Sequence, residues 1–117
     1  LNIRGTFHFD KGYYYFRNVG NRVLLGGGRN LDILGETTEE FGLSNQIQLQ
    51  LKNLLENVIL PSNSFKIEDS WSVILGVGKT KSPIIKKINN NTAIGVRMGG
   101  MGVAIGSQVG KKLADLF

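Results

Sequence analysis

The chain has 117 residues, a formal net charge of +5 and no cysteine, and 41% of its residues are hydrophobic. This length suits one modest domain, and no apolar run approaches the ~20 residues that a membrane-spanning helix needs. Without cysteine there are no disulfides or thiolate sites, and with the single histidine, His8, we expect no Ser-His-Asp triad and no metal site. We expect a cytoplasmic protein without a membrane partner.

The first part of the chain predicts an antiparallel meander of three strands. Residues 6–17 are rich in aromatic side chains, which strands favour, and Asp10-Lys11-Gly12 predicts a turn that divides them into two strands. A second turn at residues 18–21 leads to a third strand over residues 22–28. The polar residues 29–42 that follow predict a loop.

Residues 44–59 carry the clearest helical pattern in the chain. Ser44 stands directly before the periodic run as a candidate N-cap, and Pro61 follows the end of the run. The apolar residues recur at spacings of three and four, which places them in one stripe along the helix. The stripe consists of Leu43, Ile47, Leu51, Leu54, Leu55 and Val58.

The remainder of the chain alternates predicted strands and turns before a final helix. Strands are expected over residues 65–77, 84–88 and 92–98, with a turn over residues 78–83 and a helix over residues 102–116. Together with the first strands and the first helix, this order predicts an α+β fold. We expect a mostly antiparallel sheet with one crossing helix and one C-terminal helix.

One glycine motif in the second half of the chain suggests a nucleotide-binding loop. Gly78-Lys79-Thr80 matches the end of a phosphate-binding loop, but Val73 stands where the motif needs its first glycine. A helix should follow the motif directly, whereas Ser82-Pro83 and a strand-like run follow here. We therefore interpret this motif as a turn between strands.

The glycine-rich stretch near the end of the chain is a better candidate for ligand contact. Gly100, Gly102 and Gly106 are spaced one residue too widely for the dinucleotide fingerprint, and no second strand follows them in this chain. A glycine-rich loop at a helix N-terminus nevertheless exposes backbone N–H groups in a positive field. We expect ligand approach at Gly99, Gly100 and Gly102, and close helix packing at Gly106 and Gly110.

Three stretches together resemble the carboxy-terminal part of the D-amino-acid oxidase, glycine oxidase and sarcosine oxidase superfamily. They are "GYYYFRNVGNRVLLGGGRN" (12–30), "WSVILGVGKTKSPII" (71–85) and "TAIGVRMGGMGVAIGSQVGKKLADLF" (92–117). The resemblance implies a substrate domain over residues 1–91. Residues 92–117 would be the strand, loop and helix that complete an FAD-binding domain, and we treat both parts as one folded unit.

The resemblance implies that the intact protein is an FAD-dependent enzyme. It would oxidise the C–N bond of a small amino acid or amine by hydride transfer to FAD. The backbone of Gly99, Gly100, Met101, Gly102 and Val103 would lie against the flavin ring. The family's G-x-G-x-x-G unit is not in this chain, so a preceding FAD domain of the same protein would be needed, and the chain alone would be inactive.

The resemblance also implies how the substrate carboxylate would be held. The family uses an arginine of the closing loop and a tyrosine of the aromatic strand, and the nearest matches here are Arg97 and Tyr13, with Tyr15 as an alternative on the same strand face. An arginine fork suits a carboxylate because it can donate two parallel hydrogen bonds. The other interpretation of the tyrosines is sheet packing, and we expect at least one of them in the core.

Two further functions are kept as alternatives. One is a non-catalytic α+β module that binds protein or nucleic acid through its lysines, and the other is a flavin oxidoreductase that modifies tRNA. No aromatic residues interleave with the lysines, so we interpret the basic residues as a solvated face and expect no nucleic-acid partner. If an FAD domain normally covers part of this chain, the chain alone is expected to self-associate.

Overall fold

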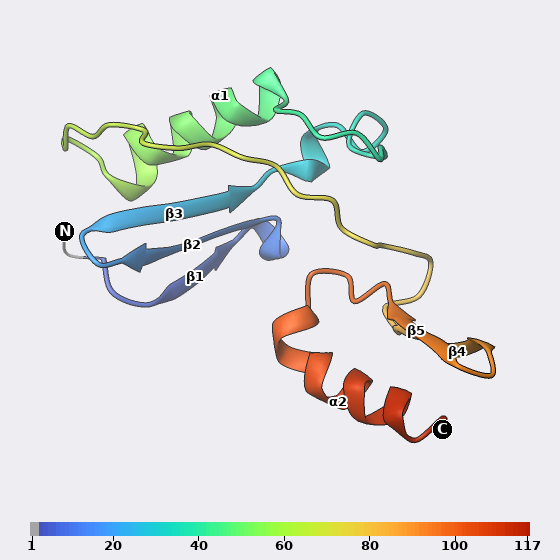
Figure 1. Ribbon diagram of the computed structural model, residues 1–117. Helices are drawn as coiled ribbons and strands as arrows, with labels where there is room; N and C mark the ends of the chain where they lie inside the picture. The colour runs from blue at the N-terminus through green and yellow to red at the C-terminus, as the bar shows by residue number, and fades with distance from the viewer. Residues whose placement is uncertain (1–2) are drawn as a thin grey trace. The chain divides into compact units, whose positions relative to one another are not determined.

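The computed structural model describes residues 3–117, which form two compact units, one that ends at Ser72 and one over Val73–Phe117. We call them the N-terminal unit and the C-terminal unit. Each has its own antiparallel sheet, of three and two strands respectively, and its own α-helix (Figure 1). The predicted α+β class is confirmed, with two separate sheets instead of one. The two units meet after Ser72, whereas the predicted division lies after residue 91. That division, between a substrate domain and part of an FAD-binding domain, stays a prediction.

The N-terminal sheet is the predicted meander. Its strands are β1 (Thr6–Phe9), β2 (Tyr14–Val19) and β3 (Arg22–Gly27), in the order β1-β2-β3. A short 3-10 turn, Asp10–Gly12, joins β1 to β2 at the predicted position. The register places Tyr14 opposite Phe9 on one side and opposite Gly27 on the other.

Helix α1 spans Asn45–Leu54 and continues as a π-helical turn over Leu55–Ile59. The Ser44 hydroxyl accepts a hydrogen bond from the Ile47 amide at 3.4 Å, so the predicted N-cap is confirmed. At the other end the Leu60 amide donates to the Leu55 carbonyl over 2.8 Å, directly before Pro61. Because proline offers no N–H for a further bond, the helix ends there.

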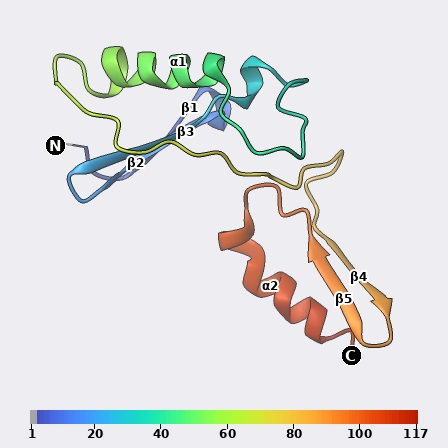
Figure 2. The same ribbon diagram turned by 45° about the horizontal axis from the view of Figure 1, so that its top comes forward.

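The core of the N-terminal unit lies between α1 and one face of the sheet, as both views show (Figures 1 and 2). Ile47 and Leu54 are the buried residues of α1, and Tyr14 is the buried residue of the sheet. Phe7 and Phe16 add a stacked pair with ring centroids 4.8 Å apart. This core is small, and the ends of the predicted apolar stripe, including Val58, are exposed.

The predicted strand over residues 65–77 is absent, which corrects the expectation from the sequence. The segment is extended but pairs with no strand of the described chain, and a strand needs a partner for its backbone N–H and C=O groups. Its contacts with other segments include an ion pair from Glu68 to Arg22 at 3.1 Å and a hydrogen bond that the Ser72 hydroxyl accepts from the Gly42 amide at 3.2 Å. Trp71, within this segment, is 60% exposed.

The C-terminal unit is a hairpin with a helix packed along it (Figure 2). Strands β4 (Ile84–Asn89) and β5 (Thr92–Val96) form the hairpin, and α2 spans Gly102–Ala114. These bounds confirm the predicted elements to within two residues. Val109 is buried against β5, where a side chain at Gly95 would come within 2.7 Å of the Val109 Cγ1. Gly95 therefore allows the close approach of α2.

Candidate functional site

The segment between β5 and α2, residues 97–101, is the most unusual backbone of the C-terminal unit. Arg97, Gly99 and Gly100 all have positive φ, at 62°, 57° and 85°. Glycine adopts such angles without strain, whereas a residue with a Cβ does not. The chain thereby makes a sharp turn from the end of the strand into the first turn of the helix.

This turn leaves backbone donors free at the positive end of α2. The Met101 amide donates to the Met98 carbonyl at 2.9 Å, and the Ala104 and Ile105 amides both donate to the Met101 carbonyl at 3.0 Å. Within the described residues the amides of Gly100, Gly102 and Val103 find no acceptor, and no side chain caps the helix. Unpaired amides at a helix N-terminus attract negative charge.

The surface around these amides is open and partly apolar. No atom lies within 4 Å of the position that a Cβ would take at Gly99 or Gly100. Val103 is fully exposed and Met101 is more than half exposed. A flat group could therefore approach the backbone closely and contact apolar side chains while it accepts hydrogen bonds.

The expected close packing at Gly106 and Gly110 is not seen within the described chain. A Cβ at either position would meet nothing within 4 Å, because α2 turns Val109 and Leu113, not its glycines, toward β5. The glycine face of α2 is therefore open in this unit.

Arg97 is held within the C-terminal unit. Its Nε and Nη2 donate to the Ser82 carbonyl at 3.3 and 2.9 Å, and its Nη2 also donates to the Thr80 hydroxyl at 2.9 Å. Two glycines of the neighbouring segment make room for it, since a Cβ at Gly76 or Gly78 would come within 3.2 Å of its atoms. Thr80 and Ser82 were not predicted from the sequence as hydrogen-bond partners of Arg97. The two glycines in a strand-like run were the available signal, because such glycines often mark close approach.

The three tyrosines divide between core and surface, as expected. Tyr14 is buried against α1. Tyr15 is on the opposite face of β2 and nearly half exposed, with its ring over Gly26. Tyr13 lies before β2 in helical backbone, so strand alternation does not place it on the face of Tyr15, and the Arg29 guanidinium lies 6.0 Å from its ring centroid.

Among the predicted site residues, the structure brings Arg97 together with the glycine-rich segment. The three tyrosines belong to the N-terminal unit, whereas Arg97 and the glycine-rich segment belong to the C-terminal unit. His8 is exposed on β1. In residues 3–117 no three His, Asp or Glu side chains gather closely enough to hold a metal ion. No helix of the described chain is long and apolar enough to cross a membrane.

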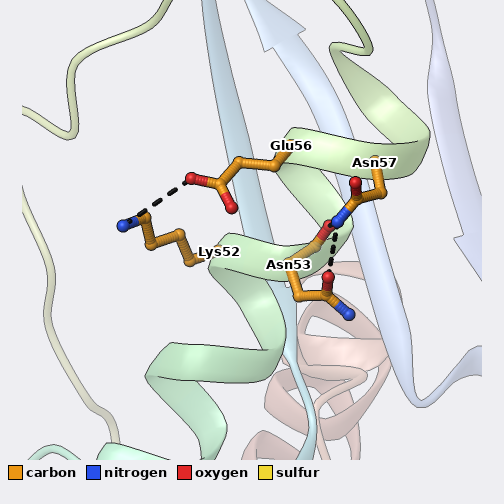
Figure 3. A network of polar contacts seen from close by, with 4 residues as sticks. All are labelled: Lys52, Asn53, Glu56 and Asn57. Carbon is orange, nitrogen blue, oxygen red and sulfur yellow. Dashed lines mark hydrogen bonds and ion pairs between the residues drawn. The ribbon is translucent and has the colours of Figure 1, made fainter.

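Two open depressions lie beside α1. They are lined mainly by polar residues, among them Lys52, Asn53 and Glu56. Figure 3 shows that these side chains bond one another: Lys52 pairs with Glu56 at 3.6 Å, and the Asn57 amide donates to the side chain and carbonyl of Asn53. Such contacts one helical turn apart stabilise the end of a helix by a few tenths of a kcal/mol. We interpret this cluster as helix support and not as a ligand site.

Comparisons with protein-family models, with curated proteins and with solved structures found no match for this chain.

Proposed function

We propose that this chain is the carboxy-terminal part of a flavin-dependent oxidoreductase that oxidises the C–N bond of an amino acid or amine. One observation supports the proposal most: the turn from β5 into α2 exposes the free amides of Gly100, Gly102 and Val103 beside glycines without side chains. The resemblance of the three sequence stretches supports it independently. The rest of the FAD would be held by a domain elsewhere in the protein.

The residues of this turn fit the pyrimidine edge of a flavin ring. That edge carries carbonyl oxygens and gains negative charge on reduction, and the free amides at the N-terminus of α2 are donors in a positive field. The ring itself is flat and largely apolar, so it could also contact the exposed side chains of Met101 and Val103. A side chain at Gly99 or Gly100 would stand in the way.

When bound, FAD would supply the acceptor for the hydride that leaves the carbon of the C–N bond. The contribution of this chain is to orient the ring and to stabilise negative charge through the amides of Gly102 and Val103. Contacts of Tyr13, Tyr15 and Arg97 with a substrate carboxylate remain predictions. Of these, Tyr15 is the most accessible, because nearly half of its surface is exposed.

The first test is the visible absorption spectrum of the whole protein that contains this chain, purified without added cofactor. We expect flavin absorption bands that bleach under anaerobic conditions when a suitable amino acid or amine is added. A colourless protein that also fails to take up added FAD would overturn the proposal.

A matched pair of variants tests whether the flavin binds at the proposed turn. Gly99→Ala and Gly20→Ala introduce the same methyl group at similar positive φ, 57° and 61°, and neither methyl meets an atom within 4 Å. Both should therefore strain the backbone equally. We expect only Gly99→Ala to weaken FAD binding, by about tenfold, since it blocks approach to the amides. Equal effects of the two variants would contradict a flavin contact at this turn.

A second candidate function is supported by the charge distribution. Residues 73–117 carry seven lysines and arginines against one acidic residue, Asp115, so the positive charge is concentrated in the C-terminal unit. This favours an anionic partner, either for a binding module or for a flavin enzyme that modifies tRNA. Such binding should weaken steeply as the salt concentration rises, and binding that is insensitive to salt would argue against it.

A further inference from the structure

Arg97 combines an uncommon backbone angle with a fully engaged side-chain edge. Its φ of 62° lies in the left-handed region, which non-glycine residues occupy rarely and with strain. On the side chain, the Nε and Nη2 groups form one of the two edges through which arginine receives a carboxylate. The Ser82 carbonyl and the Thr80 hydroxyl already occupy this edge.

The segment that Arg97 binds is shaped around it. A Cβ at Gly76 would lie 3.2 Å from the Arg97 Cα, and a Cβ at Gly78 would lie 2.8 Å from the Arg97 Cδ, and both distances are shorter than an ordinary van der Waals contact. The Gly76 carbonyl also accepts a hydrogen bond from the Gly99 amide at 3.2 Å. Segment 76–82 therefore holds the glycine-rich turn from two sides, through the Gly99 backbone and through the Arg97 side chain.

We propose that Arg97 is a positioning residue, which fixes the turn of residues 97–103 by binding segment 76–82, and not a ligand of the substrate carboxylate. The turn sets the direction of the free amides at the start of α2, so its rigidity determines how well they are aimed. The consequence for a flavin rests on the proposed function. The positioning role itself rests on the contacts alone.

Arginine suits this role better than lysine would. One planar guanidinium donates from two nitrogens to the Ser82 carbonyl and from Nη2 to the Thr80 hydroxyl as well. A lysine ammonium has no planar fork and cannot reproduce this geometry, although it keeps the charge. Arg97→Lys therefore separates the hydrogen-bond geometry from the positive charge.

The first experiment measures hydrogen–deuterium exchange of the whole protein, read at the peptide that covers residues 97–103. Within it the Gly99 and Met101 amides are hydrogen-bonded, to the Gly76 and Met98 carbonyls, and so report on the turn. We expect these two amides to exchange about tenfold faster in Arg97→Lys and in Thr80→Val, since each variant loses a hydrogen bond that holds the turn. Thr80→Ser keeps the hydroxyl and should exchange as the parent does. Arg22→Lys, which alters an exposed ion pair in the other unit, should also leave this peptide unchanged.

A second readout separates positioning from substrate binding. A positioning role predicts that Arg97→Lys and Thr80→Val both shift the flavin spectrum and reduction potential, and that Thr80→Ser restores them. A carboxylate ligand predicts a raised KM in Arg97→Lys alone, with unchanged exchange at residues 97–103, and this result would overturn the inference. Faster exchange in a protein that binds no flavin would support the positioning role while the proposed function fails.

Discussion

At the scale of single residues, the glycines of this chain serve three different purposes. Gly27 and Gly28 adopt positive φ where β3 ends, and the Gly28 amide donates to the Tyr13 carbonyl at 2.9 Å. Gly95 leaves room for a packed helix. Gly99 combines a positive φ of 57° with open space beside it, so it allows the sharp turn and leaves the backbone accessible. Composition alone does not distinguish these purposes, because each depends on what lies beside the missing side chain.

The sharpest prediction at this scale concerns Gly27. An alanine there would place its Cβ against the Tyr13 carbonyl oxygen at a φ of 114°, so both the contact and the backbone angle are unfavourable. We expect Gly27→Ala to lower the free energy of unfolding by about 2–4 kcal/mol. Urea unfolding followed by circular dichroism measures this loss. Gly20→Ala, at positive φ in open space, should lose only about 1 kcal/mol, and equal losses would contradict the explanation.

At the scale of elements, the sequence pattern predicts the observed structure wherever the backbone hydrogen bonds form within the element or with the next strand in the chain. Helix α1 begins after Ser44 as predicted, and all three antiparallel pairs form between strands that are adjacent in the chain. The segment over residues 65–77 has the composition of a strand but no adjacent partner, and it stays unpaired. Its exposed apolar side chains include Ile67, Trp71 and Val73.

The cap of α1 gives a prediction at the same scale. The Ser44 hydroxyl satisfies one amide of the first turn, at the rather long distance of 3.4 Å. We expect Ser44→Ala to destabilise the N-terminal unit by about 0.5–1 kcal/mol, at the lower end of measured N-cap effects. Thermal unfolding by circular dichroism provides the measurement. Ser44→Asp restores an acceptor and should recover the stability, and a loss as large in this variant would show that the cap is unimportant.

At the scale of the whole molecule, the described chain buries few apolar side chains for its length. Tyr14, Ile47, Leu54 and Val109 are the buried hydrophobic residues, whereas many large ones are exposed. The stability of a small domain depends mainly on apolar burial. We therefore expect the exposed apolar side chains of this chain to bind a further protein surface. This is the physical basis for expecting another domain of the same protein against it.

This surface predicts how the 117-residue chain behaves alone. We expect it to self-associate with rising concentration and to bind a hydrophobic dye, and the emission of its single tryptophan, Trp71, should shift from that of a solvated indole to shorter wavelength as it does so. Analytical ultracentrifugation and fluorescence measure these changes. A monomer that binds no dye at high concentration would show that the exposed residues are covered within the chain.

The sequence by itself determined the α+β class, the three-stranded meander, the C-terminal pair of strands, the N-cap of α1 and the glycine-rich turn before α2. These features depend on interactions between residues close in the chain, through hydrogen bonds, turn geometry and alternation of side chains. The tertiary structure decided that the sheet divides in two, that residues 65–77 remain unpaired and that Tyr14 is the buried tyrosine. It also decided that Arg97 binds Thr80 and Ser82. These outcomes depend on which distant groups meet, and the spacing of residues along a chain does not contain that information.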